Sequence, residues 1–350
     1  MHMADALLSP VVGATLWAGT AAVGGYASKK LKDRIDDRAI PLMGVLGAFV
    51  FAVQMINFTI PGTGSSGHVG GGMILAILLG PHAAFLVMAS VLTVQALFFA
   101  DGGLLALGCN IWNLGLYPCY LAYPFLYRPL AGESKKPGRI VFASVVSAVA
   151  ALQLGAFSVV LQTLFSGKSE LPFGAFLLVM QPIHLAIGIV EGLATAGVIS
   201  FVRSARPEIL ESVALSQPLG GEVSLRKVLI TFAVLALVSG GVLSWFASTR
   251  PDGLEWSIGK ITGRSDLAGQ VRGIAPALRA IQEKTAFLPD YNFPGGKTVP
   301  EEGENKTARQ GIDGGTSAAG VIGGAIVLVV IVLIGMGVRS FRGRAGRQGT

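Results

Sequence analysis

A bundle of membrane-spanning helices is the fold that this sequence predicts, and three observations lead to it. The 350 residues are 52% hydrophobic and 13% charged, whereas about 25% of the residues in a soluble domain are charged. Apolar segments close to membrane-spanning length recur along the chain. Basic residues gather in short clusters between these segments, which is how the orientation of membrane proteins is set. We therefore expect an all-α, polytopic membrane protein.

Nine apolar segments can be delimited, and we expect each to form a helix. The third is too short to cross about 30 Å of hydrocarbon as a straight helix, and Gly80-Pro81 ends it. The segments are Leu7–Tyr26, Ile40–Ile60, Val69–Leu79, Ala83–Ala100, Leu104–Leu126, Ile140–Phe165, Phe173–Val202, Val228–Ala247 and Ala318–Val338.

Four basic clusters give the expected orientation. They lie in the connections 29–38, 128–139 and 203–227 and in the residues after 338. With an external N-terminus, nine crossings place all four clusters in the cytoplasm, as the positive-inside rule requires. The C-terminus is then cytoplasmic, and the protein is expected in the inner (plasma) membrane. Because the clusters account for the net charge of +7, we expect no nucleic-acid binding.

The polar connection 203–227 divides the chain into two units. It contains Pro207, Pro218 and a Gly-Gly pair, which are typical of a linker. We expect a seven-helix membrane domain at 1–205, a cytoplasmic linker at 206–227 and a two-helix hairpin at 228–350. The two helices of the hairpin flank an external segment of about 70 residues, from Ser248 to Ser317.

The first two residues form a candidate metal chelate. The initial apolar run lacks a positive n-region and contains Asp5, so we expect residue 1 to be the mature N-terminus. The Met1 amine, the His2 main-chain nitrogen and His2 Nδ1 can close fused rings on one ion. A second histidine would complete a planar set of four nitrogens, which suits Ni(II) or Cu(II). His68, in the glycine-rich stretch PGTGSSGHVGGG at 61–72, lies on the same predicted face.

Other polar residues of the membrane segments are weaker candidates. His184 and Glu191 are seven residues apart, so they share a helix face. They are either functional residues or a buried pair that holds helices together. Asn110, together with Asp101, either orients a metal-bound imidazole or bonds across helices. We expect His82, at a predicted cytoplasmic turn, to be structural.

Several motifs of the sequence resemble the CbiM/NikM family. They are MHMADALLSP at 1–10, GSSGHVGGG at 64–72, QALFFADGGLLALGCNIWNLG at 95–115 and HLAIGIVEGLATAGVI at 184–199. Members of that family are the substrate-binding (S) subunits of energy-coupling-factor (ECF) transporters for nickel and cobalt. The stretch ASTRPDGLEWSI at 247–258 resembles the PDGLE motif of the accessory subunit, CbiN/NikN. The chain looks like a natural fusion of the two subunits.

The resemblance implies a fold, a site and partners. The fold is a seven-helix S-subunit bundle with the N-terminal segment inserted into it. The site is the Met1 amine, the His2 amide nitrogen, the His2 ring and the His68 ring, with Asn110, His184 and Glu191 as candidates to support them. The cargo is Ni(II) or Co(II). The partners are a transmembrane coupling (T) subunit, two ATPase subunits and the lipid bilayer.

The chain is expected to be a transporter subunit and not an enzyme. Its sequence contains no Walker motif, and no nucleophile, general base and orienting group share one face. The accessory hairpin is expected to help load or release the metal. One alternative is a metal-responsive membrane receptor or a scaffold that does not transport. Another is an S subunit or channel for a small molecule, which would have no need of the Met1 amine.

Overall fold

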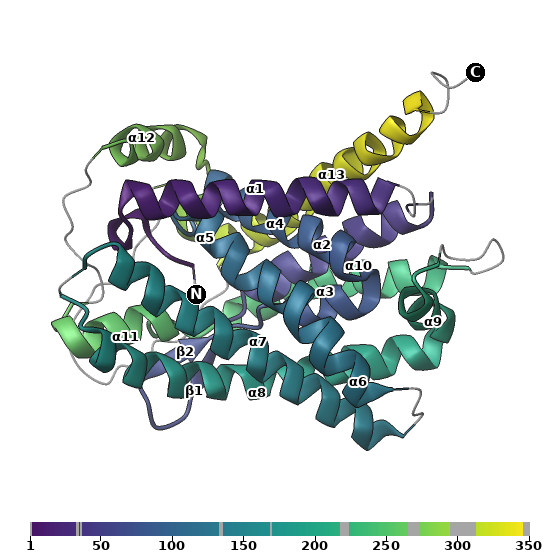
Figure 1. Cartoon of the computed structure of the whole chain (residues 1–350), viewed down its shortest axis with the longest axis horizontal. Coiled ribbons are helices and arrows are strands. Elements are labelled where there is room, and N and C mark those ends of the chain that lie inside the picture. The colour runs from purple at the N-terminus through teal and green to yellow at the C-terminus, as the bar shows by residue number, and fades with distance from the viewer. Residues whose placement is uncertain are drawn as a thin grey trace.

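The computed structural model describes residues 2–32, 35, 37–132, 136–168, 170–217, 224–264, 273–294 and 313–345. These residues form helices, their connections and one short hairpin, which lies near α11 (Figure 1). The long helices lie side by side, with α11 and α12 at one end of the molecule and α6 and α9 at the other. An all-α architecture is confirmed.

The first part of the chain contains most of the helices. Their bounds are η1 Asp5–Leu7, α1 Pro10–Lys32, α2 Ala39–Gln54, α3 Gly72–Leu79, α4 Pro81–Phe99, α5 Leu107–Ile111, η2 Trp112–Tyr127, α6 Arg128–Ala131, α7 Pro137–Phe165, α8 Phe173–Ala205 and α9 Pro207–Leu215. The helices α5, η2 and α6 follow one another without a break. Within them, Pro118 and Pro124 lack N–H donors, and η2 has π-type turns, which occur where the regular ladder is interrupted.

The second part of the chain adds two long helices and several short ones. Their bounds are α10 Arg226–Gly241, η3 Leu243–Phe246, α11 Gly253–Thr262, α12 Ala275–Thr285, η4 Pro289–Tyr291 and α13 Gly314–Ala345. Each of the nine apolar segments of the sequence contains a helix. Sequence reasoning missed α11, α12 and the antiparallel hairpin of β1 Phe58–Ile60 and β2 Ser65–Gly67. The second predicted segment, which ran to Ile60, therefore ends in a strand.

Four of the described helices are long and apolar enough to cross a membrane. They are α4, α7, α8 and the part of α13 from Gly314 to Ser340. The helix α2 is apolar but has 16 residues, and α3 has only eight. Exposed apolar side chains line α7 and α8, among them Phe142, Phe157 and Leu193, as expected of helices that face lipid. The nine crossings stay a prediction.

Glycines allow the long helices to pack closely. Gly188 and Gly192 of α8 lie against the Cα atoms of Val149 and Val145 of α7, with no room for a Cβ. The same applies to Gly320 of α13, which lies against the main chain of Gly240 in α10. Small residues at such crossings are the usual means of association between helices in a membrane. Gly47 of α2 likewise lies against Ile331 and Val327 of α13, and this contact packs the second part of the chain onto the first.

Candidate metal site

The N-terminal segment enters the bundle and is anchored there at Met3. Met3 is fully buried, and its N–H donates to Asn110 Oδ1 at 2.8 Å. In return, Asn110 Nδ2 and the Gly103 N–H donate to the Met3 carbonyl at 3.3 and 3.0 Å. Main-chain groups buried away from water need such partners. Asn110 therefore fixes the segment that carries His2. Met1 lies outside the described residues.

The glycine-rich loop that carries His68 is held from two sides. Glu191 of α8 accepts hydrogen bonds from the N–H groups of Gly70 and Gly71, at 3.0 and 3.1 Å. Gln54 of α2 donates to the Gly70 carbonyl at 2.7 Å. Gly71 has a φ of 77°, a conformation that glycine adopts without strain. The loop that places His68 is thus clamped directly after that residue.

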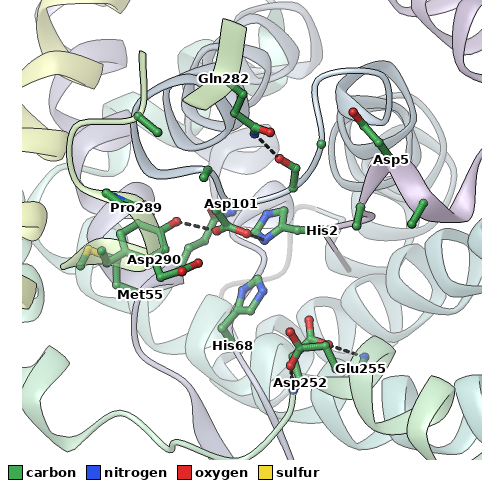
Figure 2. Close-up of a pocket in the computed structure, with 18 of the residues that line it drawn as sticks. His2, Asp5, Met55, His68, Asp101, Asp252, Glu255, Gln282, Pro289 and Asp290 are labelled. Atoms are coloured by element: carbon green, nitrogen blue, oxygen red, sulfur yellow. Dashed lines mark hydrogen bonds and ion pairs between the residues drawn. The ribbon is translucent and has the colours of Figure 1, made fainter. Parts of the chain in front are cut away.

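The rings of His2 and His68 lie together. Their centroids are 5.2 Å apart and their planes differ by 12°. Figure 2 shows the two rings beside the cavity. His68 Nδ1 faces the Val69 carbonyl at 3.3 Å, so with the proton on Nδ1 the lone pair of Nε2 is available. His2 Nε2 is buried and has no hydrogen-bond partner among the described residues. Both rings can therefore offer a nitrogen to a metal ion.

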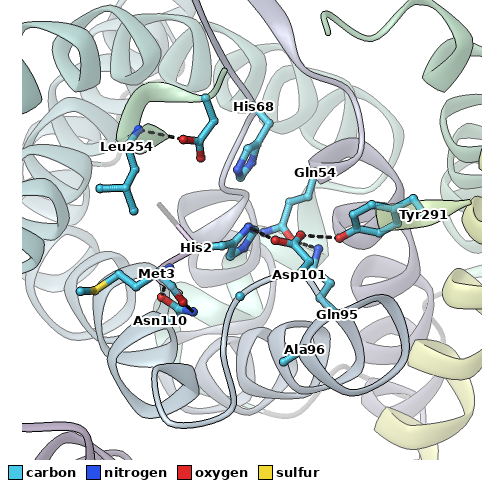
Figure 3. Close-up of polar contacts among 12 residues, drawn as sticks. His2, Met3, Gln54, His68, Gln95, Ala96, Asp101, Asn110, Leu254 and Tyr291 are labelled. Carbon is cyan, nitrogen blue, oxygen red and sulfur yellow. Dashed lines mark hydrogen bonds and ion pairs between the residues drawn. The ribbon is translucent and has the colours of Figure 1, made fainter. Parts of the chain in front are cut away.

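His2 Nδ1 faces a carboxylate. It lies 3.1 Å from Asp101 Oδ1, and Tyr291 donates its hydroxyl proton to Asp101 Oδ2 at 2.5 Å (Figure 3). The fused chelate predicted from the sequence uses Nδ1 of the same ring. The structure therefore presents the His2 ring turned toward Asp101, and its other nitrogen has no partner within the part of the chain that the structure describes.

The local electrostatics favour a cation. Burial lowers the pKa of His68 to about 3, and the neighbouring His2 ring lowers it too, so His68 is neutral at physiological pH and can act as a ligand. Burial alone would raise the pKa of Asp101, but the His2 ring and the Tyr291 hydroxyl outweigh this effect and hold the pKa below its usual range. The site thus contains an ionised carboxylate at Asp101 and a neutral imidazole at His68.

A segment of the second part of the chain, from Arg250 to Glu255, covers this site. The Ser66 N–H donates to the Pro251 carbonyl at 2.8 Å, and Ser66 Oγ donates to the Arg250 carbonyl at 2.7 Å. Asp252 and Glu255 form a reciprocal capping box that starts α11, a device that fixes the first turn of a helix. The motif PDGLE is therefore a tightly ordered turn that is docked on β2.

A cavity opens at the place where these elements meet. Its volume is about 740 Å³, and its walls include His2, His68, Asp101, Asp252 and Tyr291. Figure 2 shows the two histidines pointing into it, with Asp252 below them. Within the described part of the chain, no group of three or more His, Cys, Asp or Glu side chains is arranged to hold a metal ion.

The two other candidates on α8 do not pair with each other. His184 Nδ1 contacts the Met180 carbonyl at 2.8 Å, while Glu191 holds the glycine loop. His184 Nε2 is buried and has no partner among the residues that the structure describes, and this residue lines a small cavity together with His68 and Asp252. Both residues are buried, and each bonds main-chain atoms and not the other residue; whether they are functional or only hold the structure together stays a prediction.

Sequence reasoning missed three residues of this region: Gln54, Asp252 and Tyr291. Gln54 is an amide inside an apolar segment, and that was a usable signal. It also accepts a hydrogen bond from Gln95 at 2.8 Å. Asp252 belongs to the PDGLE stretch, so its motif was visible, but nothing local marks Tyr291. The place of both residues near His2 and His68 depends on docking across the whole fold.

Comparison with known proteins gives two family matches and several relatives. Residues 2–209 match the model of CbiM, a cobalt uptake substrate-specific transmembrane region, and residues 226–340 match the PDGLE domain. A protein of Archaeoglobus fulgidus, provisionally named fused nickel transport protein NikMN, is 31% identical over 94% of this chain and 96% of its own. The fused nickel transport protein NikMN of Rhodobacter capsulatus is 31% identical over 83% of this chain and 88% of its own.

A solved structure shares the fold of the first part. The crystal structure of a truncated transition metal transporter superposes with a TM-score of 0.52 at 31% identity, and the match covers 59% of this chain and 99% of that chain.

Proposed function

Because the chain belongs to the CbiM family of cobalt-uptake transmembrane proteins and also carries a PDGLE domain, we propose that it is the metal-binding S subunit of an ATP-driven ECF importer for Ni(II) or Co(II). At the coarser level, it is a multi-pass membrane component of a transition-metal transporter and not an enzyme. The observation that carries the proposal is the approach of the His2 and His68 rings to 5.2 Å at the wall of an open cavity.

Four nitrogens are the proposed ligands: the Met1 amine, the His2 main-chain nitrogen, His2 Nδ1 and the His68 ring. The His2 ring must turn about its Cβ–Cγ bond before Nδ1 can bind metal, since that atom faces Asp101 at 3.1 Å. After the turn, Nε2–H can be donated to Asp101 instead. A carboxylate in this position orients a ligating imidazole and makes it more basic.

The metal enters from outside, and the N-terminus is external. This orientation is supported by the basic residues at the ends of α1 and α8 that lie away from the site, among them Lys32 and Arg203. The importer contains a T subunit and two ATPase subunits, which supply the energy. Residues 1–205 form the metal-binding domain, 206–227 the linker and 228–350 the accessory domain, a division that agrees with the two matched regions.

Affinity for the metal falls as the pH falls. The main-chain nitrogen of His2 must lose its proton to bind, and the Met1 amine must be neutral, so protons compete with the ion. Among divalent ions, an all-nitrogen site binds Ni(II) more tightly than Co(II).

Elemental analysis of the purified full-length protein after exposure to Ni(II) or Co(II) tests the proposal. We expect one ion per chain, and we expect loss of the ion in three variants: an alanine inserted before Met1, His2→Ala and His68→Ala. The matched control is His82→Ala. It removes a histidine from the first turn of α4, at the opposite end of that helix from Asp101. Unchanged stoichiometry in the three variants would exclude the chelate. Binding without uptake in cells that carry the ATPase partners would favour a receptor.

A further inference from the structure

Tyr291, a residue of the accessory domain, reaches the metal site through one other side chain. Its hydroxyl donates to Asp101 Oδ2 at 2.5 Å, and Asp101 Oδ1 lies 3.1 Å from His2 Nδ1. Figure 3 shows the three side chains in a row. Tyr291 lies in the region that matches the PDGLE domain. It is therefore connected to the His2 ring at the N-terminus through two contacts, both made by Asp101.

The tyrosine ring is fixed independently of its hydroxyl. It stacks on Phe99 at the end of α4, with centroids 5.0 Å apart and planes within 17°. Around it, Thr285 and Gln282 of α12 donate to the carbonyls of Leu97 and Ala96 at 2.7 and 2.9 Å. The accessory domain thus grips the last turn of α4, which leads directly to Asp101.

The main chain at this point is strained. Asp290 and Tyr291 have φ values of 51° and 59°, in the left-handed region that residues other than glycine rarely occupy. Two consecutive residues in this conformation persist only where the surroundings stabilise them, and such strain often marks functional positions. Here it directs the Tyr291 hydroxyl toward Asp101.

We propose that Tyr291 is a positioning residue of the metal site, acting through Asp101 on the orientation of the His2 ring. The inference rests on the proposed metal-binding function. A carboxylate with one oxygen fixed by Tyr291 can present its other oxygen in one direction only. That oxygen accepts the N–H of the His2 ring, so the rotation of the ring depends on the accessory domain. The accessory domain then contributes to metal binding without supplying a ligand.

Ni(II) titration of the full-length protein tests this inference with the variant Tyr291→Phe, which keeps the stack on Phe99. We expect Ni(II) to bind about threefold to tenfold more weakly, the effect of losing one hydrogen bond behind a ligand. The visible absorption band of the bound Ni(II) is also expected to shift, because the His2 ring is held less firmly. The matched control is Tyr120→Phe, which removes a tyrosine hydroxyl 3.0 Å from His82 Nδ1, at the far end of α4.

A double-mutant cycle separates positioning from mere packing. If Tyr291 acts through Asp101, then Tyr291→Phe has little further effect in an Asp101→Asn background. An equal loss in both backgrounds, or unchanged Ni(II) affinity and spectrum in Tyr291→Phe, would overturn the inference. Failure of the proposed function would look different from these outcomes, because the His2→Ala variant itself would then still bind Ni(II).

Discussion

The Glu191 carboxylate accepts the Gly70 N–H at 3.0 Å, and its second oxygen accepts the next N–H along the chain at 3.1 Å. One buried side chain of α8 therefore fixes two successive peptide groups directly after His68. The position of that imidazole is set by a helix more than 100 residues later in the chain, since the contact spans 121 residues.

Replacing Glu191 by glutamine should weaken metal binding. The amide has one oxygen, and its NH2 group would face an N–H donor, so at least one of the two hydrogen bonds is lost. A buried N–H that is left without its partner costs about 1–3 kcal/mol, and we expect Ni(II) affinity to fall about tenfold. Isothermal titration of the full-length protein with Ni(II) measures this affinity. Equal affinity in Glu191→Gln would show that the loop does not need the clamp.

Replacing Asn110 by alanine should loosen the N-terminal segment. Met3 would lose both of its contacts with the amide, at a cost of about 1–3 kcal/mol in the free energy of unfolding. Ni(II) affinity should fall about tenfold as His2 becomes less well placed. The control is Gln162→Ala, another buried amide, which bonds Asn113 and not the main chain of Met3. A similar loss of affinity in both variants would argue for a general effect on stability.

Replacing Gly253 by valine should displace the PDGLE turn. A Cβ at Gly253 would already lie 3.1 Å from Ile183 and 3.2 Å from His184, and overpacking of this kind costs about 1–3 kcal/mol. We expect faster proteolysis of the external segment and several-fold faster Ni(II) dissociation. Gly197→Val is the matched control, because nothing lies within 4 Å of a Cβ there. If both variants release Ni(II) at the wild-type rate, the turn does not cover the site.

Acid should destabilise the metal-free protein through His68. Its pKa falls from 6.5 to about 3 on folding, so the unfolded chain binds a proton below pH 6.5 while the folded protein does not. The titration of His68 therefore has no effect on the free energy of unfolding above pH 6.5, and it lowers that free energy as the pH falls toward 3. Asp101, whose ordinary pKa is 3.8, adds to the loss only at lower pH.

The measurement is the unfolding temperature as a function of pH, in the presence of a chelator. A His68→Asn variant should show a shallower fall between pH 6.5 and 4 than the wild type. Parallel curves would show that His68 is not the titrating group. This test uses no metal, so it is independent of the proposed transport.

The helices could be predicted because their signal is local. Long apolar runs such as Ile140–Phe165 have few alternatives to a buried or lipid-facing helix. The hairpin of β1 and β2 was missed because each strand has three residues, and three residues carry too little pattern. The π-type turns in η2 were also missed, although Pro118 and Pro124 inside one apolar run were a sign of an interrupted helix.

The candidate site could be predicted only in part. The sequence placed His2 and His68 on one face, and the structure puts their rings 5.2 Å apart; their role as metal ligands stays a prediction. The direction of His2 Nδ1 could not be predicted, because it depends on the position of Asp101. That position depends in turn on Tyr291, which is 190 residues away in the chain.

The contact between Ser66 and Pro251 joins two domains that belong to a single polypeptide. Docking within one chain takes place at an effective concentration in the millimolar range for short flexible links, whatever the amount of protein in the cell. Each candidate metal site therefore always has one copy of the accessory domain in the same chain. An interaction too weak to assemble two separate proteins at cellular concentrations can still be formed most of the time here.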